Sequence, residues 1–334
     1  MMKPLGFALS ILLLLGATAA DAQARPRRLL DGKGKQKHNW VVPAQIPPAL
    51  KLALNAFDRI RYSGTRVIQV KSGTNRQQHT ELVLTNGPET RIEFPPESPL
   101  HGQIIVENPT ERRQYFPARN EIQVGPPQRD QAIQRLATIV ARRGVNVDET
   151  PGGPVAGMQT EVVSISDKKG NLLQKLWIEN KSGMILKREL YDRLGTLQAS
   201  FEFTQANLNP IIHPTDFKLE RKGVRTITPD DILTRIIRKE GFQDVRFPAG
   251  TPYKLELARM QKLASQRVLV QQYAGNGHRI SLYQLNTTVD PSRLGKIAPA
   301  GVQVYTWSAG GASFVLVGDL PEAELKDLGH RLGG

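Results

Sequence analysis

The chain has 334 residues, of which 39% are hydrophobic and 23% are charged, and it contains no cysteine. This length suggests about two domains, because one hydrophobic core rarely grows beyond roughly 250–300 residues. The lack of cysteine excludes disulfides, thiolate metal sites, cysteine nucleophiles and an acylated lipoprotein cysteine. The 45 basic side chains outnumber the 31 acidic ones and give a formal net charge of +14.

The first 24 residues have the pattern of a secretory signal peptide. Lys3 precedes the uncharged apolar stretch Leu5–Ala20, and Ala22-Gln23-Ala24 fits a small-x-small cleavage site, with Ala20-Asp21-Ala22 as a competing one. The apolar stretch is shorter than the roughly 20 residues that span a bilayer. We therefore expect residues 1–24 to be removed and the mature protein to be soluble in a bacterial periplasm, without a lipid anchor.

Residues 25–43 are expected to form a basic flexible arm. Arg25–Lys37 carries six basic residues against the single acid Asp31. Such an arm is attracted to anionic lipid headgroups or to an acidic protein partner, or it simply confers solubility. Nucleic acid is not expected as a partner, because the protein is exported and its basic residues do not alternate with aromatic ones.

Residues 44–218 are expected to form the first domain, with two helices and about ten antiparallel strands. Helical spacing of apolar residues predicts helices over Ala49–Arg61 and Asp130–Arg143, and Tyr62-Ser63-Gly64 is interpreted as a helix-to-strand turn. A Gly/Pro-rich loop is expected at Thr150–Pro154. The other segments are short, rich in β-branched residues and separated by turn residues. The predicted strands are Thr65–Val70, Thr80–Thr85, Thr90–Phe94, Gln103–Glu107, Arg112–Phe116, Glu121–Val124, Gln159–Ser166, Leu172–Glu179, Met184–Tyr191 and Leu197–Thr204.

Residues 226–334 are expected to form a smaller α+β domain after a junction at Asn209–Arg225. Thr228 and Pro229 have the residue types of a helix N-cap and first helical position, and Gly241 ends that helix. A tight turn is predicted at Asn276-Gly277, and a last helix over Glu322–Leu332. The predicted strands are Arg267–Tyr273, Arg279–Asn286, Val302–Ser308 and Ala312–Gly318.

The sequence contains no recognisable catalytic or metal-binding motif. The six histidines have no ligand spacing, and HExxH, GxSxG, Walker and GxGxxG-helix patterns are missing. Ser63 is interpreted as a turn residue and His278 as a strand-entry residue. We therefore expect a protein without enzyme activity, metal or cofactor, and keep an envelope hydrolase as the weakest alternative.

The predicted large sheet has more apolar surface than two helices of its size would cover tightly. One interpretation is an unclosed antiparallel β-barrel plugged by helices, with a cavity for an apolar ligand. The other is a closed sandwich filled by side chains, and periodicity does not separate the two. Strand parity assigns fourteen residues to the inside, although a bulge would reverse a strand. The predicted cavity-lining residues are Ile68, Val70, Leu82, Leu84, Ile92, Phe94, Ile104, Val106, Tyr115, Leu176, Ile178, Leu186, Phe201 and Phe203.

Several stretches of the chain carry motifs of one known family. They are Tyr62-Ser63-Gly64-Thr65, the double hairpin Leu176–Thr204, Gly275-Asn276-Gly277, Gly301–Trp307 and the segment Ser313–Pro321. In these stretches the chain resembles the MucB/RseB family, periplasmic regulators of the envelope-stress sigma factor. The resemblance covers most of residues 49–330. Two features depart from it: the strand Arg112–Phe116 matches no family motif, and the arm Arg25–Lys37 is unusually basic.

The resemblance implies a fold and a function. It implies a first domain like the lipoprotein carriers LolA and LolB, an unclosed antiparallel barrel plugged by helices, followed by the small α+β domain. It also implies a non-enzymatic sensor that binds the periplasmic part of a membrane-anchored anti-sigma factor and shields it from proteolysis. An amphiphilic lipid or lipoprotein would release it. A periplasmic lipid or lipoprotein carrier remains the alternative, but LolA-type carriers generally lack a second domain.

Overall fold

The computed structural model describes residues 46–72, 75–128, 136, 140, 145–192, 194–263, 266–287 and 303–333. The expected signal peptide, the basic arm and most of the expected helix Asp130–Arg143 lie outside these residues. The described residues divide into two compact units. The first contains residues 46–122 and 127–225, and the second contains residues 226–333 together with Gln123–Pro126.

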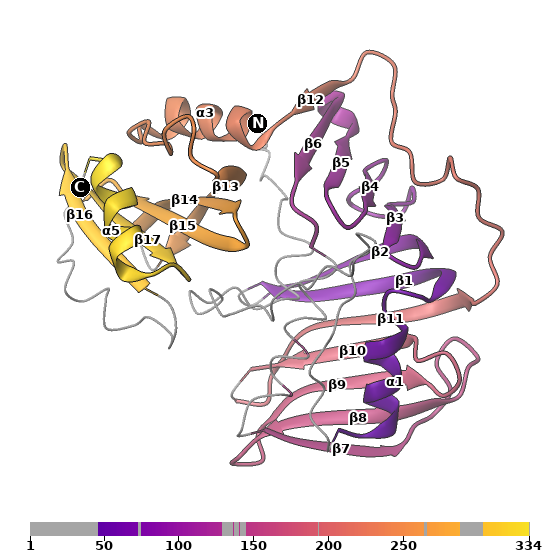
Figure 1. Ribbon diagram of the computed structural model, residues 1–334. Coiled ribbons are helices and arrows are strands. Elements are labelled where there is room, and N and C mark those ends of the chain that lie inside the picture. The colour runs from indigo at the N-terminus through magenta and orange to yellow at the C-terminus, as the bar shows by residue number, and fades with distance from the viewer. Residues whose placement is uncertain are drawn as a thin grey trace, which may run out of the picture. The chain divides into compact units, whose positions relative to one another are not determined.

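A twelve-stranded antiparallel sheet dominates the first unit (Figure 1). Among the described strands the order is β12-β6-β5-β4-β3-β2-β1-β11-β10-β9-β8-β7, so that β12 and β7 are the edge strands and the sheet is unclosed. The predicted fold class, a large unclosed sheet followed by a smaller unit, is thereby confirmed. The strands are β1 (Arg61–Ser72), β2 (Asn75–Asn86), β3 (Glu89–Glu93), β4 (Ile104–Glu107), β5 (Arg112–Phe116), β6 (Glu121–Gly125), β7 (Val145–Pro151), β8 (Thr160–Asp167), β9 (Leu172–Glu179), β10 (Ile185–Tyr191), β11 (Leu197–Asn207) and β12 (Arg225–Ile227).

Helix α1 (Pro48–Ala56) lies across β8 and β9 on one face of this sheet (Figure 1). Pro48 occupies the first helical turn, where a missing N–H breaks no helical hydrogen bond. The next N–H, that of Ala49, donates to Glu149 Oε2 of β7 at 3.0 Å. Leu50 and Leu54 are buried between helix and sheet. We call the face that α1 covers the inner face and the opposite one the outer face.

The start of β1 corrects the predicted helix and turn. α1 ends at Ala56, and residues 62–64 belong to β1, not to a turn. Tyr62 packs edge-to-face on Phe203, with ring centroids 5.8 Å apart. A Cβ on Gly64 would overlap the carbonyl oxygen of Gln205 in β11. Glycine therefore serves the close approach of two strands here, and a β-bulge follows between Thr65 and Arg66.

Three strands are absent from the sequence prediction. β7 begins where the predicted helix Asp130–Arg143 ends and includes Thr150, which had been assigned to a loop. β12 has only three residues, and β13 lies in the second unit. In β7 the alternating Val145 and Val147 pack against the cluster that contains α1. Short or edge strands of this kind carry little periodic signal of their own.

Among its described residues, the second unit has a five-stranded sheet of order β13-β14-β15-β17-β16 and two helices. Helix α3 (Pro229–Glu240) begins with the predicted cap, since Thr228 and Asp231 form a reciprocal capping box, and it ends at Gly241 with φ +72°. Helix α5 (Glu322–Arg331) packs through Leu325 and Leu328 on an aromatic core. The strands are β13 (Lys254–Leu263), β14 (Gln266–Gly275), β15 (His278–Leu285), β16 (Gln303–Ala309) and β17 (Ala312–Gly318).

Candidate functional site

Nine of the fourteen predicted cavity-lining residues lie on the inner face. Residues that pair directly across neighbouring strands share a face. A series of such pairs leads from Ile68 through Phe201 and Arg188 to Leu176, which packs in the cluster of α1. Leu186 lies at a bulge of β10 and belongs to the same cluster as Phe203. The nine are Ile68, Val70, Ile92, Phe94, Leu176, Ile178, Leu186, Phe201 and Phe203.

The other five lie on the outer face, so their predicted inward orientation is wrong. β1 and β2 pair without a bulge, with Leu82 opposite Thr65, whereas Ile68 of the same β1 points to the inner face. The pairing of β2 with β3, β4 and β5 carries this parity onward. It is Val83, between the two leucines, that is buried on the inner side. The five are Leu82, Leu84, Ile104, Val106 and Tyr115.

The inner face of β8 and β9 is apolar and covered by helix. Val163 and Leu176 are 0% exposed and pack with Leu50 of α1. Leu136 and Val140, which are helical and buried, join the same cluster. Side chains of the same chain therefore bury the apolar surface of this part of the sheet.

The inner face of β1, β10 and β11 carries a second apolar cluster. Ile68, Val70 and Ala199 form it, with Leu190 and Phe201 packed against them. All five come from strands of the sheet, and none of the described helices contributes a side chain to the cluster. This second cluster lies next to the apolar cluster under α1, because Phe201 and Leu176 both pair with residue 188 of β10.

Beside this cluster, the inner face carries buried charges. Glu81 of β2 is 0% exposed and receives hydrogen bonds from Arg66 Nε at 2.7 Å and from His79 Nε2 at 3.0 Å. The guanidinium of Arg66 also lies over the rings of Phe201 and Phe203, at 5.4 and 5.9 Å from their centroids. Arg66 thus contacts both the apolar cluster of β1, β10 and β11 and the carboxylate of Glu81. We call Arg66 and Glu81, together with Arg112 of β5, the charged group.

The protonation of Glu81 follows from this environment. Burial raises the pKa of its carboxyl, but the charge of Arg66 and the hydrogen bonds from His79 and Arg66 outweigh burial. The pKa therefore lies below its ordinary value of 4.5, and the group is a carboxylate at neutral pH.

A second buried arginine lies on the same face of β5. Arg112 pairs with Glu107 of β4, whose Oε2 is 3.7 Å from Arg112 Nε, and Glu107 Oε1 accepts a hydrogen bond from the N–H of Gln128 at 2.7 Å. Burial lowers the pKa of Arg112 below its ordinary value, and Glu107 and Glu81 oppose this shift. Arg112 Nε makes no hydrogen bond within the described residues. It is a buried donor with unused capacity.

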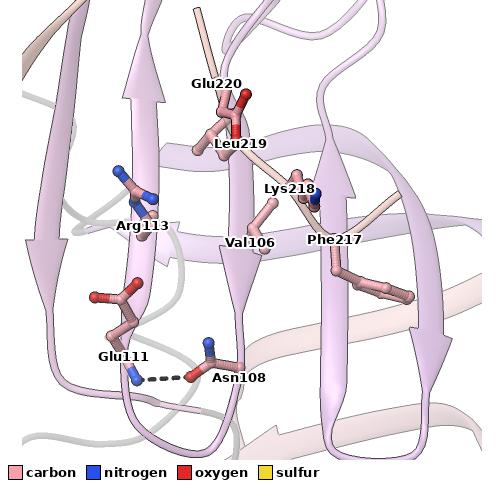
Figure 2. A pocket seen from close by; sticks show the side chains of 8 residues that line it. All are labelled: Val106, Asn108, Glu111, Arg113, Phe217, Lys218, Leu219 and Glu220. Carbon is pink, nitrogen blue, oxygen red and sulfur yellow. Dashed lines mark hydrogen bonds between the residues drawn. The ribbon is translucent and has the colours of Figure 1, made fainter. Parts of the chain in front are cut away.

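The outer face of β3–β5 is covered by the chain itself. Residues 208–224, which we call the strap, connect β11 to β12, and Arg91 Nη1 of β3 donates to the carbonyls of Asp216 and Lys218 at 3.0 and 3.2 Å. Leu219 of the strap is buried. Figure 2 shows the strap beside Val106, where a small pocket of about 180 Å³ remains. Its lining residues are Val106, Asn108, Glu111, Arg113, Phe217, Lys218, Leu219 and Glu220.

The structure gives the residues weighed for catalysis ordinary positions. Ser63 lies within β1, and His278 begins β15 with Nδ1 3.3 Å from Asp319 Oδ1. Within the described ranges, no group of three or more metal-ligating side chains comes together. No helix in this part of the chain is long and apolar enough to cross a membrane.

Sequence reasoning missed the charged group because its members are not adjacent in sequence. Arg66, Glu81 and Arg112 come from three strands and meet only through pairing. The available signal was their parity: Arg66 is two residues from Ile68, and Glu81 is two residues from Val83. Charged residues that share a strand face with core residues indicate a buried network only when the inner face of the sheet is known.

No protein-family model and no curated protein matches this sequence. Solved structures with a similar course include a Pseudomonas aeruginosa MucA/MucB complex, at 14% identity and a TM-score of 0.42 over 84% of this chain and 95% of that chain. Another is MucB in complex with MucA(peri), at 13% identity and a TM-score of 0.41, with the same coverage. A LolA superfamily protein from Nitrosomonas europaea follows at 12% identity and a TM-score of 0.27, over 51% of this chain and 96% of that chain.

MucB structures are thus among the solved structures that are similar to this chain.

Proposed function

We propose that this protein is a non-enzymatic periplasmic sensor that binds an amphiphile on the inner face of its large sheet. The observation that carries the proposal is the apolar cluster of β1, β10 and β11, to which no described helix contributes, next to Arg66 and Glu81. Such a surface suits a ligand with an acyl chain and a polar headgroup, a lipid or the lipid part of a lipoprotein. Arg112, with its unused donor, adds a polar contact for the headgroup.

The proposed protein partner is the periplasmic segment of a membrane-anchored anti-sigma factor. The family resemblance supports it, and two of the similar MucB structures are complexes with MucA. In this proposal the protein shields that segment from proteolysis, and the amphiphile releases it. No cofactor takes part, and nucleic acid is not a partner.

Binding of a fluorescent fatty acid tests the ligand, with two aspartate substitutions on opposite faces of the large sheet. Phe201→Asp should lower the affinity at least about 100-fold, because it places a charge in an apolar surface at a cost of several kcal/mol. Leu84→Asp is the matched control on the outer face and should leave binding unchanged. Equal affinities of the two folded variants would contradict the proposal.

A protease-protection assay tests the partner. The purified protein should slow cleavage of an anti-sigma periplasmic segment by its site-1 protease, and a lipid that binds the wild-type protein should restore cleavage. The Phe201→Asp variant should protect the segment but not respond to lipid. Lipid binding without any protection would favour the alternative, a periplasmic lipid or lipoprotein carrier.

A further inference from the structure

Five basic side chains lie on the strap, on η2 and at the start of β12, where the end of the strap runs beside β5 and β6. Asn120, between η2 (Pro117–Arg119) and β6, holds the strap in place: its Nδ2 donates to the carbonyl of Gly223 at 3.0 Å, and its carbonyl accepts from the N–H of Arg225 at 3.1 Å. The strap thereby brings its own cations next to that of η2. We call this group the basic patch. Its members are Arg119, Lys218, Arg221, Lys222 and Arg225.

Contacts below the surface hold the arginines of the basic patch in position. The Arg221 guanidinium lies over the Tyr115 ring at 5.6 Å, and that of Arg119 lies over Phe116 at 4.7 Å. Arg119 and Arg225 both pair with Glu121. Arginines ordered in this way lose less rotamer freedom when they bind an anion.

The charge that the basic patch shows to solvent is positive. The side chain of Glu121 is only 2% exposed, whereas those of its partners Arg119 and Arg225 remain 48% and 68% exposed. Lys218, Arg221 and Lys222 are exposed as well, and Glu220 is the one acidic residue among positions 217–225. The ion pairs therefore anchor the arginines without hiding them.

We propose that the basic patch docks the protein on an anionic membrane surface. Four cations within the eight residues Lys218–Arg225 match the density of basic clusters that bind anionic headgroups. Ile211, on the same strap, is 85% exposed and adds an apolar side chain of the kind that inserts between headgroups. This function is independent of the amphiphile site, because it uses other residues.

Vesicle binding by the full mature chain tests the proposal. The probe is vesicles of phosphatidylcholine with 30 mol% phosphatidylglycerol, at about 50 mM salt, measured by co-sedimentation. The triple variant Lys218→Gln, Arg221→Gln, Lys222→Gln should bind roughly 100-fold more weakly than the wild type, and the wild type should lose binding as salt rises. Arg225 and Arg119 stay in place, so that Glu121 keeps its partners.

A matched control removes three exposed cations from hairpin turns elsewhere in the same sheet, as Lys168→Gln, Lys169→Gln, Lys181→Gln. This control should bind within about threefold of the wild type, and the exchange Lys218→Arg, Arg221→Lys, Lys222→Arg should also retain binding. The proposal would be overturned if the first triple variant bound vesicles as tightly as the wild type. Equal losses of binding in that variant and in the control would also overturn it. So would a patch that binds a poly-glutamate peptide but not vesicles, since an acidic protein would then be its partner.

Discussion

The inner face of the large sheet differs in polarity between two regions, the apolar side under α1 and the charged side on β1, β2, β4 and β5. Under α1 it is aliphatic, and Leu176 and Val163 have no exposure at all. On β1, β2, β4 and β5 the same face carries Arg66, Glu81 and other buried charges. Stability favours the first arrangement, because replacing a buried ion pair by well-packed apolar residues is often neutral or stabilising. The charged side therefore calls for a functional explanation, which the proposed binding of an amphiphile would supply.

The largest expected difference between the two sides comes from Glu81→Gln. The substitution leaves Arg66 and His79 without their shared carboxylate and should reduce the free energy of unfolding by about 3–5 kcal/mol. Urea denaturation followed by circular dichroism measures it. The double variant Arg66→Leu, Glu81→Leu should recover most of the loss, and a double variant as unstable as Glu81→Gln would show that the pair itself stabilises the fold.

A somewhat smaller loss is expected on the apolar side from Leu176→Ala. This change opens a cavity beneath α1 and should reduce the free energy of unfolding by about 2–4 kcal/mol, since the surrounding side chains relax only in part. The same urea titration measures it, at two salt concentrations. The loss should be the same at both salt concentrations, because the substitution changes no charge. A clear salt dependence would contradict the purely apolar environment of Leu176.

The smallest expected effect is a dependence on pH. Because the pKa of folded Glu81 lies below its ordinary value of 4.5, the carboxylate stabilises the fold fully above that value. This contribution is lost as the pH falls below 4.5 and through the folded-state pKa. Unfolding titrations between pH 7 and pH 3 should therefore bring the wild type closer to Glu81→Gln, with no such convergence for Leu176→Ala. A constant gap between the wild type and Glu81→Gln would contradict the assigned pKa shift.

The sequence allowed the large sheet to be predicted, but not the orientation of its middle strands. Hairpin turns such as Asp167–Asn171 carry strong local chemistry, and the Asp167 carboxylate accepts from the N–H groups of Lys169 and Asn171 as expected of such a turn. The predicted orientation of β2 is wrong for a physical reason: its outer leucines are more apolar than its inner Glu81 and His79. Alternation finds the apolar side of a strand, which is the core only when the core is apolar.

The site was harder to predict than the fold for a related reason. The cluster under α1 follows from aliphatic residues at regular spacing, so Leu176 and Ile178 could be assigned from sequence. The ion pairs Arg66–Glu81 and Glu107–Arg112 cross the hairpins β1–β2 and β4–β5, so they depend on the register of each hairpin. Polar residues that face the core give no hydrophobic pattern from which that register could be assigned. The strap is a similar case, since its predicted role was that of a junction and it also covers β3–β5.

The place of β1 in the sheet also bears on how the chain folds. Thr204 Oγ1 of β11 donates to the carbonyl of Thr65 in β1 across a separation of 139 residues. Hairpins such as β1–β2 and β8–β9 close short loops, whereas the β1–β11 pairing closes a very long one and so forms late. Until then Ile68 and Val70 lie on an open strand edge, which is prone to aggregate. While the chain folds, a chaperone that covers this edge would prevent such aggregation.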